Sequence, residues 1–223
     1  MTKKLVFLHT VASLAAMFDK LAKETLPKGI EVIHLVDEML LKDVLKAGGL
    51  TKFTYQRVAE HVISAERFGA SVIQFTCSSI SPCVDAVQVM VQIPVLKIDE
   101  PMVDDAIRIG KKIGVAATAP TTLKPTADLI AARADILKKK VEVHPVLCVG
   151  AYDALFRGDL ALHDSIVLDT LQGLMEKNDV VVLAQASMAR VAAQIPEDRR
   201  IVPVLSSPAF AMKKLIGIFA QAE

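Results

Sequence analysis

The residues best suited to chemistry lie in one short stretch, Thr-Cys-Ser-Ser at residues 76–79. An apolar segment at residues 71–76 predicts a strand before the thiol, and Pro82 opens a helical pattern after it. Cys77 is therefore expected in a turn at the carboxyl end of a strand, where open α/β sheets bind their ligands. The free N–H groups and the positive dipole end of the following helix favour a thiolate or a substrate carboxylate at that point.

The competing interpretation is that Cys77 is a small core residue, because free cysteine is among the most buried residue types. The neighbouring hydroxyl groups favour the chemical interpretation, since a core cysteine does not need them. The chain has two more cysteines, Cys83 on the helix that follows and Cys148 after a later strand. The three show no metal-ligand spacing, so no metal site is predicted.

Strands and helices alternate along the whole chain, which predicts an α/β fold with parallel sheets covered on both faces. The strands are predicted at residues 5–9, 30–36, 71–76, 94–98, 111–117, 141–146, 179–184 and 201–205. The helices are predicted at residues 11–26, from 37 to about 47, 51–68, 81–91, 99–109, from the end of a hydroxyl-rich turn at 118–122 to about 137, 152–177 with a break near 158, 188–194 and 206–220.

The two halves of the chain resemble each other at a period near 108 residues. The paired segments are residues 4–10 with 112–118, 71–79 with 179–187, and 95–101 with 202–208. This repeat predicts two similar lobes related by a pseudo-two-fold axis, with the strand ends of both facing one interlobe cleft, the default place for a small-molecule site. The predicted boundaries are 1–98 for the N-terminal lobe, 99–205 for the C-terminal lobe, and 206–223 for a helix that packs back on the N-terminal lobe.

Neutral hydrogen-bonding side chains gather at the predicted strand ends. They are Thr10, Ser78, Ser79, Thr118, Thr121, Thr122, Gln185 and Ser187. Together with helix N-termini they suit a carboxylate without any cationic side chain. Each serine or threonine could instead be only a helix N-cap, but clustering at matching points of a repeat favours a binding site.

These residues resemble the aspartate/glutamate/hydantoin racemase superfamily over the whole chain. The resemblance rests on Phe-Thr-Cys-Ser-Ser at residues 75–79, on Gly-Val-Ala-Ala-Thr-Ala-Pro-Thr-Thr at residues 114–122, and on the two-lobe repeat. It implies an enzyme without a cofactor. In the two-cysteine members of the superfamily, one thiolate removes the proton α to a carboxylate, and the opposite thiol returns a proton to the other face.

By that resemblance Cys77 is the catalytic thiol of the first lobe, and Ser78 and Ser79 are donors to the carboxylate. In the same way, the family's second-lobe binding turn matches three residues, Thr118, Thr121 and Thr122. The α-proton is only weakly acidic, so the base must be desolvated and the enolate charge must meet preorganised donors.

The second-lobe cysteine of the superfamily is absent. The repeat puts Gln185 opposite Cys77, while a shift of one residue would put Ala186 there, and neither side chain is an acid or base near neutral pH. A single thiol still permits one-sided chemistry: decarboxylation with stereospecific reprotonation, isomerisation, or attack on a double bond. A different second base would restore racemisation; His9, at the end of the first strand, is the candidate, with a satisfied strand-end histidine as the alternative.

The composition sets broad limits on function. Apolar residues make up 52% of the chain, enough for a sizeable core, and 26 Lys and Arg balance 25 Asp and Glu. This balance predicts no nucleic-acid partner, and no stretch is apolar enough for a membrane span. An odd cysteine count without a secretory signal predicts reduced thiols in the cytoplasm.

The sequence thus predicts a cofactor-independent racemase- or isomerase-like enzyme that acts at the carbon α to a carboxylate of a small amino or organic acid. The alternatives are a one-thiol decarboxylase or cis–trans isomerase of the same superfamily, a non-catalytic carboxylate-binding protein, and a periplasmic-type ligand binder. A homodimer or higher homo-oligomer is expected.

Overall fold

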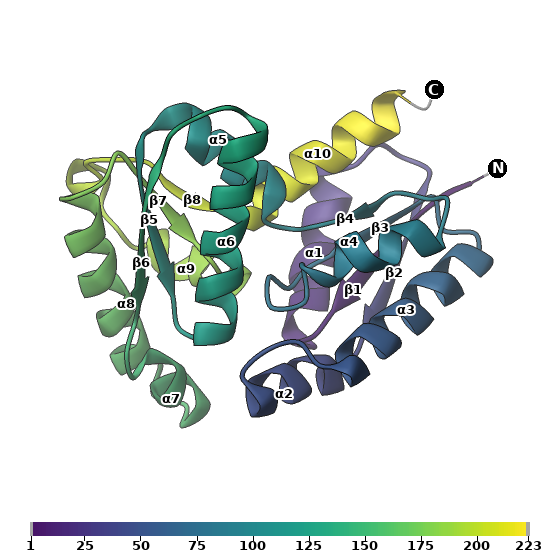
Figure 1. The fold of residues 1–223 in the computed structure, drawn as a ribbon, viewed down its shortest axis with the longest axis horizontal. Coiled ribbons are helices and arrows are strands. Elements are labelled where there is room, and N and C mark those ends of the chain that lie inside the picture. Colours follow the sequence, from purple (N-terminus) through teal and green to yellow (C-terminus); the bar gives the residue numbers. More distant parts are fainter. Residues whose placement is uncertain (1, 222–223) are drawn as a thin grey trace. The chain divides into compact units, whose positions relative to one another are not determined.

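Over residues 2–221, which the computed structural model describes, the strands form two four-stranded parallel sheets (Figure 1). The first sheet has the order β2 (Ile30–Val36), β1 (Lys3–His9), β3 (Val72–Phe75) and β4 (Val95–Leu96). The second has the order β6 (Glu142–Leu147), β5 (Lys112–Ala117), β7 (Val180–Leu183) and β8 (Val204–Ser206). The predicted α/β class with parallel sheets is confirmed.

Helices connect the parallel strands, as parallel pairing requires. They are α1 (Ser13–Thr25), α2 (Glu38–Ala47), α3 (Lys52–Arg67), α4 (Cys83–Val87), α5 (Glu100–Ile109), α6 (Pro120–Ile136), α7 (Ala151–Phe156), α8 (Leu160–Met175), α9 (Ala189–Ala192) and α10 (Ser207–Gln221). Short 3₁₀ turns add η1 (Gln88–Met90), η2 (Ala186–Met188) and η3 (Glu197–Arg199).

The chain divides into two compact units, each with one sheet. Unit 1 is Met1–Ile98 together with Pro208–Glu223, and unit 2 is Asp99–Ser207. The sequence placed the corresponding boundaries after residues 98 and 205. Helix α10 belongs to unit 1, where the Lys3 ammonium donates a hydrogen bond of 3.1 Å to the Phe219 carbonyl.

The two sheets repeat one strand order, because in each the first strand of the unit lies between the second and the third. The pairing register repeats as well. Leu8 lies opposite Phe75 in unit 1, and Ala116 lies opposite Leu183 in unit 2. Both pairs are separated by the same number of residues, so positions in the two units can be matched one by one.

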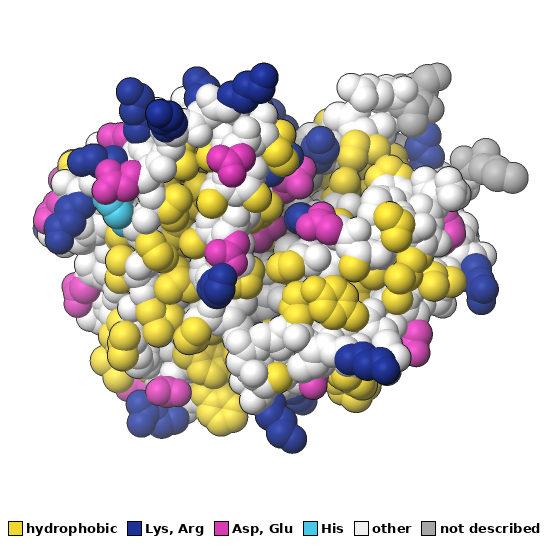
Figure 2. Space-filling model, viewed as in Figure 1, with side chains coloured by type: hydrophobic (Ala, Val, Ile, Leu, Met, Phe, Trp, Pro, Cys, Tyr) yellow, Lys and Arg dark blue, Asp and Glu magenta, His cyan; other side chains and the backbone are white. Residues whose placement is uncertain are grey.

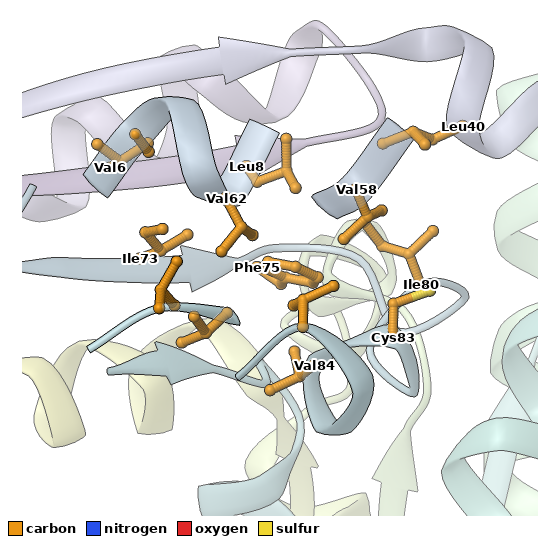
Figure 3. Close-up of a cluster of buried hydrophobic side chains, with 14 of the residues drawn as sticks. Val6, Leu8, Leu40, Val58, Val62, Ile73, Phe75, Ile80, Cys83 and Val84 are labelled. Carbon is orange, nitrogen blue, oxygen red and sulfur yellow. The ribbon is translucent and has the colours of Figure 1, made fainter. Parts of the chain in front are cut away.

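Apolar side chains from alternate strand positions form the core on one face of the first sheet (Figure 3). The labelled members are Val6, Leu8, Leu40, Val58, Val62, Ile73, Phe75, Ile80, Cys83 and Val84. Ile80 comes from the turn that follows Cys77, so the turn is anchored in this core. Burying an aliphatic or aromatic side chain of this size stabilises the fold by about 1.5–3 kcal/mol.

Helices α2 and α3 begin where side chains cap their free N–H groups. The Asp37 carboxylate accepts from the Met39 N–H at 3.0 Å, and Thr51 and Thr54 form a reciprocal capping box. Gly48 ends α2 in the left-handed conformation, at a φ of 73°, which glycine adopts without a steric penalty. These sequence signals therefore fix the α2–α3 hairpin locally.

The edge strands are shorter than the sequence predicts. The segment predicted at residues 94–98 pairs only at Val95–Leu96, and the one at 201–205 pairs at Val204–Ser206. Pro203 has no N–H to donate to the ladder, although its carbonyl accepts from the Val181 N–H at 2.9 Å. The helix predicted at residues 81–91 is also shorter, because α4 passes into η1 after five residues.

Gly110 ends α5 and packs directly against Asp179. A Cβ atom at Gly110 would lie 2.4 Å from the Asp179 Cβ, and Asp179 also accepts two 2.8 Å hydrogen bonds from the Lys111 and Lys112 N–H groups. Gly110→Ala is therefore expected to destabilise the protein by about 1–3 kcal/mol, through overpacking and loss of those bonds. Gly173→Ala in α8 is the control, since nothing lies within 4 Å of its added Cβ, and it should gain about 0.5–1 kcal/mol. Urea unfolding measures both, and wild-type stability in Gly110→Ala would contradict the expected clash.

Candidate active site

The Cys77 thiol lies in a tight turn between β3 and α4. The Cys77 carbonyl accepts from the Ile80 N–H at 3.3 Å and from the Ser81 N–H at 3.1 Å, which folds the chain back on itself directly after the strand. Cys77 is partly exposed, whereas Cys83 and Cys148 are buried. Burial raises the pKa of Cys83 to about 12, so that thiol is unreactive. Cys77 is therefore the cysteine that a solute can reach.

Hydrogen-bond donors converge on the Cys77 sulfur. Burial raises the pKa of Cys77, but the Thr10 hydroxyl and the N–H groups of Ser79 and Ile80 oppose this rise by hydrogen bonding to the sulfur. The hydroxyls of Thr10 and Ser79 are almost fully buried and have no nitrogen or oxygen partner within residues 2–221. The site therefore rests with a protonated thiol and carries the donors that a thiolate or another anion would use.

The strand register settles which residue of unit 2 matches Cys77. Thr10 and Cys77 each lie two positions beyond the Leu8–Phe75 pair, and Thr118 and Gln185 each lie two positions beyond the Ala116–Leu183 pair. Gln185, and not Ala186, is thus the equivalent of Cys77. The Gln185 side-chain carbonyl accepts from the Thr118 N–H at 2.6 Å and from the Thr118 hydroxyl at 3.0 Å, so it occupies both donors of that residue.

The remaining predicted binding residues differ in what their side chains contact. In the first turn of α6, the Thr122 hydroxyl donates to the Ala119 carbonyl at 2.9 Å, while the Thr121 hydroxyl is buried without a partner within the described chain. Ser78 is buried in the Cys77 turn, and Ser187 is exposed on η2. Unit 1 brings Thr10 and Cys77 together with Ser79, and unit 2 brings Thr118 and Gln185 together.

His9, the predicted second acid or base, is fully buried at the end of β1. Its Nδ1 lies 2.9 Å from the Thr76 hydroxyl, and its Nε2 lies 2.9 Å from Nδ1 of His34. Burial, aided by the neighbouring His34, lowers the pKa of His9 to about 4. Both ring nitrogens already have partners, so a second acid/base role for His9 stays a prediction that requires one of these bonds to break.

A charged cluster at the carboxyl end of β2 was not predicted. The buried Asp37 carboxylate pairs with the Arg57 guanidinium and lies 2.7 Å from Nε2 of His61. Burial works against the charge, but hydrogen bonds from His61 and Arg57 hold the pKa of Asp37 below its ordinary value. The capping position of Asp37 was visible in the sequence, whereas its partners lie 20 and 24 residues away on α3.

Charges elsewhere are also paired or dispersed. The Arg190 guanidinium donates two hydrogen bonds of 2.6 and 2.7 Å to the Asp164 carboxylate. On the face shown in Figure 2, basic and acidic side chains are interspersed, as the net charge of +1 suggests. Among residues 2–221, no group of three histidine, cysteine or acidic side chains is placed to hold a metal ion. The helices of that range are all too short or too polar to cross a membrane.

Two parallel sheets of one strand order define an α/β protein of two similar units, of which the first has a partly exposed strand-end cysteine among hydroxyl groups. The family model for Asp/Glu/Hydantoin racemase matches residues 8–215, and the chain belongs to this family. The resemblance seen in the sequence is thereby confirmed. No curated protein matches the sequence.

Solved racemase structures share the fold. A glutamate racemase from Bacillus anthracis aligns with a TM-score of 0.75 at 19% identity, over 99% of this chain and 82% of that one. An aspartate racemase homologue from Pyrococcus horikoshii aligns with a TM-score of 0.70 at 17% identity, over 99% and 100% of the two chains. An allantoin racemase from Klebsiella pneumoniae gives 0.65 at 18% identity, over 99% and 89%. At these identities the likeness concerns the fold.

Proposed function

We propose that this racemase-family protein is a cofactor-independent enzyme that acts at the carbon α to a carboxylate of a small amino or organic acid, with Cys77 as its single catalytic thiol. The observation that carries the proposal is the convergence of the Thr10 hydroxyl and the Ser79 and Ile80 N–H groups on the one accessible sulfur. Because its pKa is raised, the Cys77 thiol rests in the protonated form and is not a base in that form. Donors directed at it make the thiolate accessible during turnover.

Neutral donors support a carboxylate as the group that is bound. Ser78 and Ser79 in unit 1, and Thr118, Thr121 and Thr122 in unit 2, are hydroxyl side chains at strand ends or in a first helical turn. Thr121 keeps an unpartnered, buried hydroxyl within the described chain, and a bound oxygen would satisfy it. The structural neighbours are named as racemases of glutamate and allantoin, and as an aspartate racemase homologue, which agrees with a small acid or its derivative.

The chemistry is one-sided in this proposal. The Cys77 thiolate takes the proton from the α-carbon, and the electron pair of the broken C–H bond moves into the carboxylate as an enolate. The same sulfur then returns a proton to the same face. Gln185, the equivalent of Cys77, has an amide that neither donates nor accepts a proton at neutral pH.

The same single thiol would also serve a decarboxylase, by protonating the carbanion left when CO₂ departs, or a cis–trans isomerase, by adding to a double bond. A non-catalytic carboxylate-binding protein is the alternative outside the enzyme class. The three cysteines are unpaired, which supports a reducing compartment such as the cytoplasm as the working place. A homo-oligomer is part of the same proposal, by family resemblance.

Solvent exchange tests the proposal directly. Wild-type protein in D₂O, incubated with amino acids, hydroxy acids and substituted malonates, is expected to place deuterium at the α-carbon of at least one compound, as followed by ¹H NMR. Because one thiol serves one face, exchange should run faster than inversion of configuration. Binding of a carboxylate without exchange, isomerisation or loss of CO₂ would instead identify a binding protein.

A further inference from the structure

Two side-chain contacts link the ends of β1 and β3 on successive positions. Thr10 and Cys77 each lie two positions beyond the Leu8–Phe75 pair, and the Thr10 hydroxyl acts on the pKa of the Cys77 thiol. One position earlier, His9 Nδ1 lies 2.9 Å from the Thr76 hydroxyl. The backbone continues this pairing, since the Leu8 carbonyl accepts from the Thr76 N–H at 3.1 Å. The His9–Thr76 contact therefore joins the residues that directly precede Thr10 and Cys77 in the sequence.

The His9 contact continues outward to the protein surface. His9 Nε2 lies 2.9 Å from Nδ1 of His34, and Nε2 of His34 lies 3.8 Å from a carboxylate oxygen of Asp19 on α1. Lys23, also on α1, pairs with Asp19 at 2.7 Å. Exposure rises along the chain of contacts, from none at His9 to 20% of the side chain at His34 and 39% at Asp19.

Apolar rings enclose the two imidazoles. Phe7 stacks on His34 at 5.5 Å between ring centroids, and Phe18 of α1 lies 5.2 Å from Phe7 and 5.8 Å from His9. The titratable groups that face the imidazole pair are therefore Asp19 and Lys23 from α1. A buried and a partly exposed imidazole therefore share one hydrogen bond beside the phenylalanine rings.

Unit 2 lacks this chain of contacts. The shared register matches His9 with Ala117 and Thr76 with Ala184, and it matches His34, opposite Phe7, with Pro145, opposite Val115. None of the three matched residues has a side chain that can hydrogen-bond. The histidine chain thus occurs in the unit that carries the thiol and is absent from the unit that carries Gln185.

We propose that His9 and His34 are positioning residues for Cys77, with the Asp19 carboxylate as the charge that favours protonation of His34. The Thr76 hydroxyl and the two imidazoles form a directed hydrogen-bond chain beside Thr10 and Cys77, and this chain reverses direction when His34 takes up a proton. Only the effect of this chain on catalysis rests on the proposed function of Cys77. The hydrogen-bond chain and its response to protonation do not depend on that function.

Counting hydrogens gives the direction of the chain. With both imidazoles neutral, the Thr76 hydroxyl donates to His9 Nδ1, His9 Nε2–H donates to His34 Nδ1, and His34 Nε2–H points at the Asp19 carboxylate. Each imidazole then has one N–H and one lone pair. The partners of His9 satisfy both of its nitrogens, whereas Nε2 of His34 has no hydrogen-bond partner within the described chain and lies 3.8 Å from the Asp19 carboxylate. The Leu8 carbonyl keeps the Thr76 N–H as its donor.

Proton uptake reverses every bond. A cationic His34 has a hydrogen on Nδ1, so His9 Nε2 must become the acceptor and His9 must carry its hydrogen on Nδ1. That N–H then donates to the Thr76 oxygen, and the Thr76 hydroxyl turns to the Leu8 carbonyl, 3.1 Å away. Burial lowers the pKa of both histidines, to about 4 at His9, while Asp19 opposes the lowering at His34. His34 is therefore the first to take up a proton as the pH falls.

Imidazole ¹⁵N NMR tests the reversal without any substrate. At pH 7.5 His9 is expected as the Nε2–H tautomer, and on acidification it should switch to Nδ1–H, still neutral, at the midpoint where His34 becomes cationic. Asp19→Asn removes the carboxylate that favours the cation and should move this midpoint to lower pH. Asp128→Asn removes the partner of Lys124 at the same helical spacing in unit 2 and should leave the midpoint unchanged. One fixed His9 tautomer throughout the titration of His34 would overturn the proposal.

The rate of Cys77 alkylation by iodoacetamide, measured by peptide mass spectrometry from pH 5 to 9, tests the positioning role. His34→Asn keeps an acceptor for His9 but cannot take up a proton, so it should retain the wild-type rate at high pH and lose the inflection at the His34 midpoint. His34→Ala breaks the chain and should change the rate at every pH by roughly two- to tenfold, the range set by one hydrogen bond. His144→Gln in unit 2 is the control. A wild-type profile in both His34 variants overturns the proposal, whereas turnover retained in Cys77→Ser overturns only the proposed function.

Discussion

Cys77→Ser is expected to lose turnover by roughly 10²- to 10⁴-fold in kcat, the usual contribution of a positioned acid–base group. A serine hydroxyl at this position still accepts hydrogen bonds from the Thr10 hydroxyl and the Ser79 N–H, so the turn should fold as in the wild type. A hydroxyl, however, is far less acidic than a thiol and cannot become the base near neutral pH. The measurement is the initial rate of α-proton exchange in D₂O, with far-UV circular dichroism as the check on folding.

The control for this variant is Cys148→Ala, which removes a thiol from unit 2. Cys148 is buried in the core between α8 and the second sheet. It is expected to lower stability somewhat and leave the exchange rate per folded molecule unchanged. If Cys77→Ser exchanged the α-proton at the wild-type rate, the thiol would have no catalytic role. If the wild type and Cys77→Ser both bound a carboxylate and neither exchanged its α-proton, the chain would be a carboxylate-binding protein.

Gln185→Glu is expected to raise the KM for an acidic substrate by roughly ten- to hundredfold, the effect of one nearby like charge in a partly buried site. The substitution is almost isosteric, and the introduced carboxylate can still accept from the Thr118 N–H and hydroxyl, as the amide does. It adds a negative charge beside the turn that is proposed to bind the substrate carboxylate. Because the charge acts on the bound substrate and on the enolate alike, kcat should change less than KM.

The control for this variant is Gln172→Glu, which adds the same charge at an exposed position on α8. Its kinetic constants should match those of the wild type at 0.15 M salt, where charges more than about 8 Å apart are largely screened. Steady-state kinetics over a range of substrate concentrations separate KM from kcat. An unchanged KM in Gln185→Glu would remove the Thr118 turn from the proposed binding residues.

The regular elements could be predicted because their signals are local. Strand Ile30–Val36 and the break between α7 and α8 follow directly from the apolar period and from Gly158, which adopts a φ of 79°. The first and last residues of the edge strands could not be predicted from local signals, because the length of an edge strand depends on which of its N–H groups find a partner. Pro203 shows this, because it lies inside the apolar run and cannot donate.

The candidate site was predictable in its residues but not in its contacts. The position of Cys77 follows from one strand and one turn, and the equivalence of Gln185 needed only the register of two strand pairs. The pairing of His9 with His34, and of Asp37 with α3, joins residues that are distant in sequence. No periodicity encodes such pairs, since each depends on the sheet order and on the helix that covers the strand.

The division of the chain has a consequence for truncation. Unit 2 is one continuous segment, whereas unit 1 contains α10, which follows all of unit 2 in the sequence. A chain that ends before residue 208 keeps every strand of unit 2, while unit 1 loses the helix that carries the buried Ala211, Met212, Leu215 and Phe219. Such a truncated chain should fold its second unit and leave apolar surface uncovered on its first.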